Sequence, residues 1–286
     1  MGDMIPISHF SARMRSAFVA LGLAAALSAA CLTNFHRAKR DYAAGQEHAA
    51  AMRTEQAVAS WKRAADDAGR ASLRRPSAQS YTVKGLAEAN LGRWREAEAS
   101  FLKAFSLGFA KGESWAADAA LAGLAASFAE FGLEAPALRM YAQLLDRSDF
   151  RPALMFAAEK RTDLVLAGAV GLEPRDRDRA LSGLNKALDR LIDRDFACGL
   201  YHYLHAQVDG HLGDLRRSYE EAVMARELGL PAEKILRDND NQLVYCYLRL
   251  RESLPAAEAE AFAAAHARWA GQWGWRDART PAWKKE

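Results

Sequence analysis

The stretch YTVKGLAEANLGRWREAEASFLKAFSL, residues Tyr81–Leu107, decides the fold of this chain. It contains good helix formers on both sides of a glycine, which predicts two helices joined by a short turn. Small side chains allow two helix backbones to approach closely, and a large ring can fill the gap to the next helix pair. The small, turn and aromatic positions are Gly85, Gly92, Ala97, Phe101 and Ala104.

The same frame recurs forty residues earlier and forty residues later (85 − 45 = 40, 125 − 85 = 40). The earlier copy has Gly45, Ala57, Trp61 and Ala64, and the later copy has Ala125, Ala137, Tyr141 and Leu144, with a turn residue at Gly132. Weaker copies have Gly168, Ala180, Leu184 and Ala187, and then Ala206, Gly213, Ser218, Ala222 and Ala225 before Pro231. A fixed period of this length is typical of proteins built from stacked supersecondary units.

These positions resemble the tetratricopeptide repeat, in which two antiparallel helices cross at small residues and aromatic rings lie between successive pairs. The resemblance covers roughly residues 38–231. It implies an all-α fold, a right-handed superhelical stack of about five helix pairs over residues 36–231. Residues 232–286 then form capping helices and a tail, with helices expected at Asn241–Glu252 and Ala256–Gly271, because a stacked array must cover its last apolar face.

Composition agrees with an all-α class and excludes some functions. Hydrophobic residues make up 50% of the chain, and we find no alternating stretch typical of a strand. The net charge of +3, from 39 basic and 36 acidic side chains, gives no electrostatic reason to expect a nucleic-acid partner. Arg74–Arg75 and Arg175–Arg179 are interpreted as solvated surface.

Residues 1–35 predict a signal peptide or membrane anchor. Arg13 and Arg15 precede an uncharged stretch from Ser16 to Phe35, as in a secretory signal. Leu27–Cys31, LSAAC, resembles the lipobox of bacterial lipoproteins, which implies lipidation of Cys31. Two alternatives stay open: an uncleaved transmembrane helix, since about 20 residues span a bilayer, and cleavage after Ala30 to a soluble periplasmic protein. Each places the bulk of the chain at the cell envelope, outside the cytoplasm.

The resemblance also predicts which residues face a partner. In tetratricopeptide arrays the first helix of each pair lines a concave groove, a surface suited to a helix or an extended peptide. The carboxylate clamp of chaperone-docking members is absent, because the matching positions carry no cation. The predicted groove residues are Tyr42, Gln46, Thr82, Leu86, Asn90, Ala126, Glu130, Tyr203, Gln207 and His211.

Three further groups of residues have both a chemical and a structural interpretation. His202, His205 and Asp209 share a helix face and could meet one metal ion, but their apolar neighbours favour packing, and we expect no metal, cofactor or catalytic site. Cys198 and Cys246 either form a disulfide or are buried thiols. The tail tryptophans Trp269, Trp273, Trp275 and Trp283 suit either sugar stacking or the packing of a cap.

The sequence therefore predicts a non-catalytic scaffold that binds another envelope protein, of unknown identity, in its groove and is attached to a membrane through its N-terminus. The alternative is an accessory protein that binds glycan or peptidoglycan through the C-terminal tryptophans.

Overall fold

The computed structural model describes residues 34–284, and α-helices α1–α12 account for most of them. The extended pairing in this part of the chain is one isolated bridge between Asp277 and Thr280. The predicted all-α fold of stacked helix pairs is confirmed. The chain divides into two compact units, one up to Leu164 (unit 1) and one from Val165 (unit 2).

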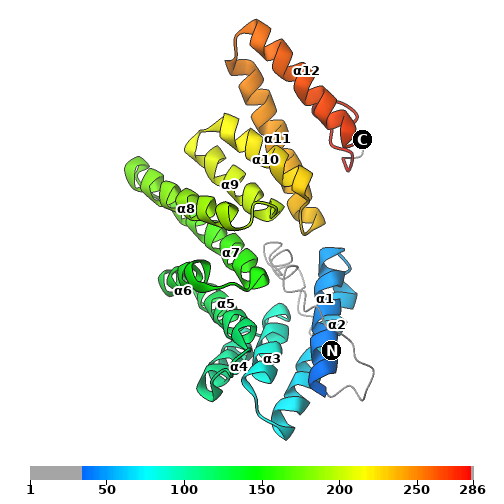
Figure 1. The fold of residues 1–286 in the computed structure, drawn as a ribbon, viewed down its shortest axis with the longest axis vertical. Coiled ribbons are helices and arrows are strands. Elements are labelled where there is room, and N and C mark those ends of the chain that lie inside the picture. The colour runs from blue at the N-terminus through cyan, green and yellow to red at the C-terminus, as the bar shows by residue number, and fades with distance from the viewer. Residues whose placement is uncertain (1–33, 285–286) are drawn as a thin grey trace, which may run out of the picture. The chain divides into compact units, whose positions relative to one another are not determined.

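Unit 1 consists of three helix pairs followed by the first part of α7 (Figure 1). Within each pair, α1 packs on α2, α3 on α4, and α5 on α6. Successive pairs are joined by α2–α3 and α4–α5 contacts, and the first helices also contact one another, α1 with α3 and α3 with α5. The helices are α1 Asn34–Ala50, α2 Thr54–Arg74, α3 Ala78–Asn90, α4 Trp94–Leu107, α5 Ser114–Glu130, α6 Glu134–Arg147 and α7 Arg151–Ala169.

The predicted small and aromatic positions meet as expected in unit 1. A Cβ added at Gly85 would lie 2.7 Å from Cε1 of Phe101, so the ring lies directly on the backbone of α3. Trp61 covers Gly45 in the same way in the first pair. Phe101 also lies against Gly123 of α5, where an added Cβ would clash with Cζ of the ring. The ring of Phe101 therefore packs against the first helix of its own pair and against the first helix of the next pair. Gly123 is a close-packing position that the forty-residue pattern does not include.

The turns inside the helix pairs use a left-handed residue. Gly92 and Gly132 both have φ 75°, a conformation that costs glycine little and other residues more. Forty residues before Gly92, the first pair has Met52 at φ 59°, so a methionine adopts the same left-handed conformation there. The repeat thus keeps the backbone of the turn even where the glycine is missing.

Unit 2 contains the remaining helices and the C-terminal tail. Consecutive helices pack together from α8 to α12, and α9 also contacts α11. Pro174 marks the start of α8. Asp214 caps the start of α10, because its side chain accepts a hydrogen bond from Arg217 N at 3.0 Å. The helices are α8 Pro174–Arg194, α9 Gly199–Leu212, α10 Leu215–Leu228, α11 Glu233–Ser253 and α12 Ala256–Gln272.

The weak fourth copy of the repeat differs from the others at its glycine. Gly168 is exposed near the end of α7, and open space surrounds the position of an added Cβ. Leu184 and Ala187 of the same copy are buried. The fourth copy therefore keeps two buried positions on α8, whereas its glycine has no close neighbour.

The predicted lipidation site Cys31 and most of the predicted segment 1–35 lie outside the described residues. Its last two residues, Asn34 and Phe35, belong to the first turn of α1. Among residues 34–284, no helix is both long enough and apolar enough to cross a membrane.

Candidate functional site

The predicted groove residues of unit 1 are mostly buried. Side chains that are at most 7% exposed occupy six of the positions, namely Tyr42, Gln46, Thr82, Leu86, Asn90 and Ala126. Glu130, at the end of α5, is exposed. In unit 2, Tyr203 and Gln207 of α9 are half-buried and His211 is exposed. Partner binding by the ten predicted groove residues stays a prediction. The four whose side chains reach the surface are Glu130, Tyr203, Gln207 and His211.

Two of the buried groove positions, Thr82 and Asn90, form hydrogen bonds within their own helix. Thr82 Oγ1 donates to Ala78 O at 2.9 Å, and Asn90 Nδ2 donates to Leu86 O at 2.8 Å. Burial raises the pKa of the Tyr42 hydroxyl far above its ordinary value, with partial opposition from Gln46 and Asn90. These side chains therefore contribute to the packing of α1 and α3.

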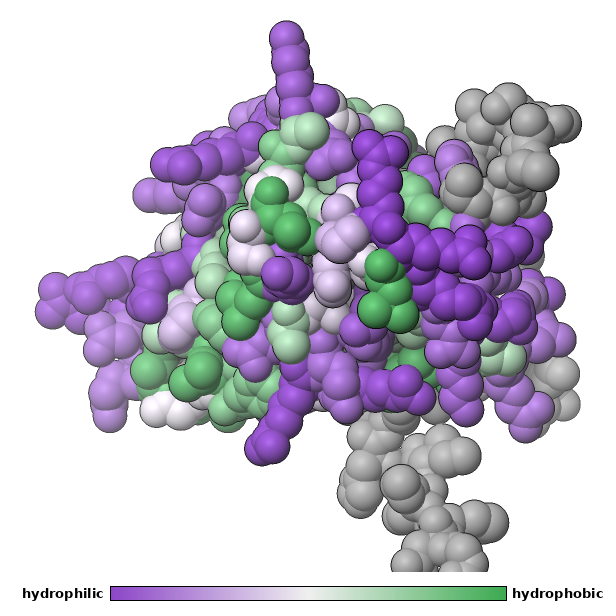
Figure 2. Space-filling model, turned by 90° about the horizontal axis from the view of Figure 1, so that it is seen from below, coloured by the Kyte–Doolittle hydropathy of each residue, from purple (hydrophilic) through white to green (hydrophobic). Residues whose placement is uncertain are grey.

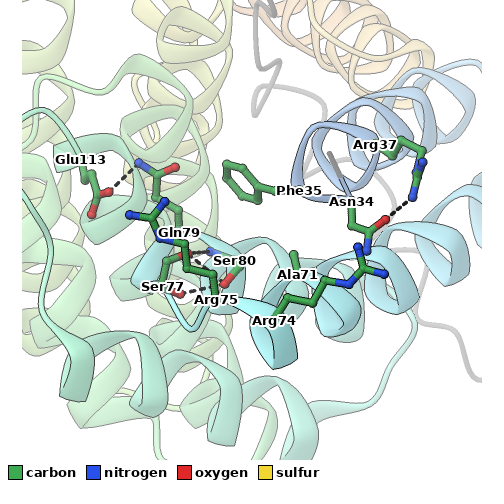
Figure 3. A pocket seen from close by; sticks show the side chains of 10 residues that line it. All are labelled: Asn34, Phe35, Arg37, Ala71, Arg74, Arg75, Ser77, Gln79, Ser80 and Glu113. Carbon is green, nitrogen blue, oxygen red and sulfur yellow. Dashed lines mark hydrogen bonds between the residues drawn. The ribbon is translucent and has the colours of Figure 1, made fainter. Parts of the chain in front are cut away.

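A pocket of about 640 Å³ opens at the start of α1 (Figure 3). Its walls come from the first turn of α1, the end of α2, the α2–α3 connection, the start of α3, and Glu113 just before α5. Figure 3 shows the ring of Phe35 with the side chain of Gln79 on one side of it and that of Asn34 on the other. The lining residues are Asn34, Phe35, Arg37, Ala71, Arg74, Arg75, Ser77, Gln79, Ser80 and Glu113.

The side chains that line this pocket carry three positive charges and one negative charge. Arg37 is 3.5 Å from Asp67 and donates to Asn34 Oδ1. Arg74 and Arg75 are exposed and form no ion pair with any of residues 34–284. Both oxygens of Glu113 already accept hydrogen bonds, one from Gln79 Nε2 at 2.8 Å and one from Ala110 N at 2.9 Å. The pocket is therefore a cationic site with two arginines available.

The sequence alone did not identify this pocket. The predicted solvent exposure of Arg74 and Arg75 agrees with the structure, but their sequence gives no sign of the cavity that they line. The available signal was the neighbouring Leu73, an apolar residue at the end of a helix next to two cations. Leu73 is 86% exposed, so it has no packing role in unit 1.

The histidine cluster of unit 2 is a buried network of ion pairs and hydrogen bonds. His205 is fully buried, with Nδ1 2.7 Å from Asp209 Oδ2 and Nε2 3.0 Å from Asp189 Oδ1. Arg217 Nη2 donates to the same Asp189 oxygen at 2.8 Å, and Asn185 Nδ2 donates to Asp209 Oδ1 at 2.8 Å. Carboxylates from α8 and α9 thus bracket the imidazole.

These contacts determine the direction in which the pKa of His205 shifts. Burial alone would lower the pKa of His205, but the hydrogen bond and the charge of Asp209, together with Glu221 and Asp189, raise it above the ordinary value. His202 points elsewhere, with Nδ1 2.6 Å from Glu221 Oε2 and Nε2 2.9 Å from Phe196 O. His202, His205 and Asp209 therefore do not converge on one point, and no group of potential metal ligands occurs among residues 34–284.

The tail tryptophans pack against the last helices of unit 2. Trp275 is 6% exposed and belongs to a core cluster with Ala206, Ala222, Leu243 and Ala270, against which Trp269 and Trp273 pack. Trp283 Nε1 donates to Asp240 Oδ2 at 3.0 Å, and Arg226 is 3.2 Å from the other oxygen of this carboxylate. Burial raises the pKa of Asp240. This arrangement favours the structural interpretation of the tryptophans.

Cys198 and Cys246 are both buried, and the structure contains them as thiols rather than as a disulfide. Cys246 Sγ lies 3.3 Å from Ser218 Oγ, and burial raises the pKa of its thiol. A buried thiol with a raised pKa is a poor nucleophile.

The face seen in Figure 2 carries apolar side chains separated by charged ones, rather than one continuous apolar surface. Strong binding through such a face depends on specific charges and pockets more than on apolar area.

No family model matches the chain, and no curated protein matches it. A solved structure described as the TPR2AB-domain:pHSP90-complex of yeast Sti1 is similar to it, with a TM-score of 0.32 and 14% sequence identity over 82% of this chain and 91% of that chain. The contacts between its helices make the chain an all-α protein of stacked helix pairs.

Proposed function

We propose that this protein is a non-catalytic interaction scaffold at the cell envelope, which recruits another envelope protein through the first helices of its repeats. The observation that carries the proposal is the succession of contacts between α1, α3 and α5. Helical repeat arrays present such a row of first helices to a peptide or a helix, and Glu130 is the predicted groove residue of α1, α3 and α5 that is exposed.

The residue contacts support a scaffold over an enzyme. The imidazole nitrogens of His202 and His205 are each within hydrogen-bonding distance of a carboxylate or a carbonyl, so they are committed to structure. The thiol of Cys246 is buried. The polar groups that the sequence singled out for chemistry thus have structural roles.

Partner capture from solubilised envelope tests the binding proposal. Leu86 is 1% exposed, so charge at this position would disturb packing and is not informative. Glu130→Lys in unit 1 and Tyr203→Ala in unit 2 instead change groove residues that reach the surface. We expect either variant to lose a specific protein that the wild-type chain retains. Glu96→Lys on α4, a second helix, is the matched control, and equal loss in this variant contradicts the proposal.

We infer attachment to the membrane from the sequence of residues 1–35, through lipidated Cys31 or through an uncleaved apolar helix. Cys31→Ser tests this: loss of palmitate labelling and release from the membrane fraction support lipidation. A variant that stays embedded supports the apolar helix, and a wild-type chain that fractionates as a free periplasmic protein contradicts attachment.

A further inference from the structure

We propose that the cationic pocket at the start of α1 binds the phosphate head group of an anionic phospholipid. This inference rests on the proposed attachment of the N-terminus to a membrane. It assigns the pocket a ligand class, an anionic lipid in the same bilayer, and makes the orientation of unit 1 at the membrane surface depend on that lipid.

The first argument is where the chain enters unit 1. Asn34 and Phe35 line the pocket and form the first turn of α1. Cys31 lies only three residues before Asn34 (34 − 31 = 3), and three residues span at most about 11 Å. A chain held in the bilayer at or before this point keeps the pocket within reach of the lipid head groups.

The second argument is charge. Arg37, Arg74 and Arg75 line the pocket against the single carboxylate of Glu113, which leaves a net charge of +2 (3 − 1 = 2). Glu113 already accepts hydrogen bonds from Gln79 and Ala110, so it does not neutralise the two arginines that lack ion pairs in the described chain. Guanidinium groups bind phosphate oxygens through paired hydrogen bonds, which makes a phosphodiester a suitable ligand.

The third argument is the apolar residues next to these cations. Leu73, 86% exposed, immediately precedes Arg74 and Arg75 at the end of α2. Phe35 lines the pocket from α1, and Lys39 Nζ lies 5.0 Å from the centre of its ring. Basic side chains beside exposed leucine and aromatic residues are typical of surfaces that lie in the membrane interface, where the apolar side chains enter the acyl region.

An acidic segment of a partner protein is the competing ligand for two free arginines. It would use the same charges, but it would not explain why an exposed leucine adjoins them, nor why the pocket lies at the start of α1. The position of the pocket and Leu73 therefore favour the lipid.

The experiment uses the full chain mixed with vesicles of phosphatidylcholine, without or with phosphatidylglycerol, and reads amide hydrogen exchange by mass spectrometry. We expect phosphatidylglycerol to slow exchange in the segment 71–80. The double variant Arg74→Gln/Arg75→Gln should need a roughly 30-fold higher level of anionic lipid for the same slowing, because each basic residue near an anionic surface contributes about a factor of five.

The matched control is Arg93→Gln/Arg95→Gln, which removes the same charge at the start of α4. These arginines are exposed and lie beyond the other end of α3, about 20 Å from the pocket for a helix of 13 residues. We expect this variant to behave like the wild-type chain. Equal losses in the two double variants would mean that only net charge matters, and they overturn the pocket.

The outcomes separate this inference from membrane attachment. Flotation with vesicles of pure phosphatidylcholine reports the attachment of the N-terminus to the membrane. The difference in amide exchange of residues 71–80 between the two lipid mixtures reports lipid binding in the pocket, whether or not the N-terminus is attached. An absence of that difference overturns the inference. Slowing by an added glutamate-rich peptide, without any effect of phosphatidylglycerol, also overturns it and assigns the pocket to an acidic protein segment.

Discussion

Replacement of Gly85 by alanine tests the packing rule on which the repeat depends. A Cβ at this position would lie 2.7, 2.8 and 3.0 Å from three atoms of the Phe101 ring, whereas ordinary contacts begin at 3.4 Å. The ring would have to move by about 0.7 Å (3.4 − 2.7 = 0.7), but it is fully buried and its other edge already lies against Gly123. Overpacking of this kind costs about 1–3 kcal/mol.

The sign of the effect separates packing from helix propensity. An alanine in a helix interior is about 0.5–1 kcal/mol more favourable than glycine, so without a clash Gly85→Ala would stabilise the protein. Gly69→Ala in α2 is the matched control, because nothing lies within 4 Å of its added Cβ. We expect Gly69→Ala to gain that amount and Gly85→Ala to be about 2 kcal/mol less stable than the control.

The assay is urea unfolding followed by far-ultraviolet circular dichroism, in a double-mutant cycle with Phe101→Leu. Leucine lacks the Cε and Cζ atoms that an alanine at position 85 would meet, so the cost of Gly85→Ala should fall by about 1–2 kcal/mol in that background. An equal cost in both backgrounds, or stabilisation by Gly85→Ala alone, would refute the reasoning.

Three further predictions concern a turn, the buried histidine and the cap. Met52→Gly should raise the free energy of unfolding by about 0.5–1 kcal/mol. The left-handed conformation costs methionine about 1–2 kcal/mol, and glycine loses part of this gain because its unfolded chain is more flexible. A lower urea midpoint in this variant would contradict the prediction. Burial lowers the pKa of His205, but Asp209, Glu221 and Asp189 outweigh it and raise this pKa above its ordinary value. The contribution of the protonated imidazole to the free energy of unfolding is therefore complete below pH 6.5, and it is lost as the pH rises through the pKa of the folded state. His205→Gln should therefore cost more stability at pH 5 than at pH 8, and an equal cost at both would show that the imidazole stays neutral. Trp275→Ala should cost about 3–5 kcal/mol and expose the amides of α12 to hydrogen exchange while those of α3 keep their protection; unchanged α12 protection would exclude the tail as a cap.

The sequence predicted the helix pairs well because their signals are local and repeated. Gly85, Phe101 and Gly92 each have one physical role, and the forty-residue period repeats those roles in register. The same logic explains the partial failure at Gly168, where a glycine matched the period without any ring to accommodate it.

The candidate sites were harder to predict because they depend on contacts between distant residues. The pocket joins Phe35, Arg74 and Glu113, which are far apart in the chain and belong to no motif. In the histidine cluster, His205 and Asp209 share a helix face as expected, but Asp189 and Arg217 come from the neighbouring helices and turn a possible ligand pair into an ion network. Spacing along one helix cannot reveal which side chains its neighbours supply.

The double contact of Phe101 bears on how such an array can be shortened, lengthened or recombined. A cut of the chain between Phe101 and Gly123 would separate this aromatic ring from the glycine of α5 against which it packs. A graft that keeps α3, α4 and α5 together retains both contacts of the Phe101 ring, with Gly85 and with Gly123. The smallest unit that keeps the packing of this ring is therefore three helices rather than one helix pair.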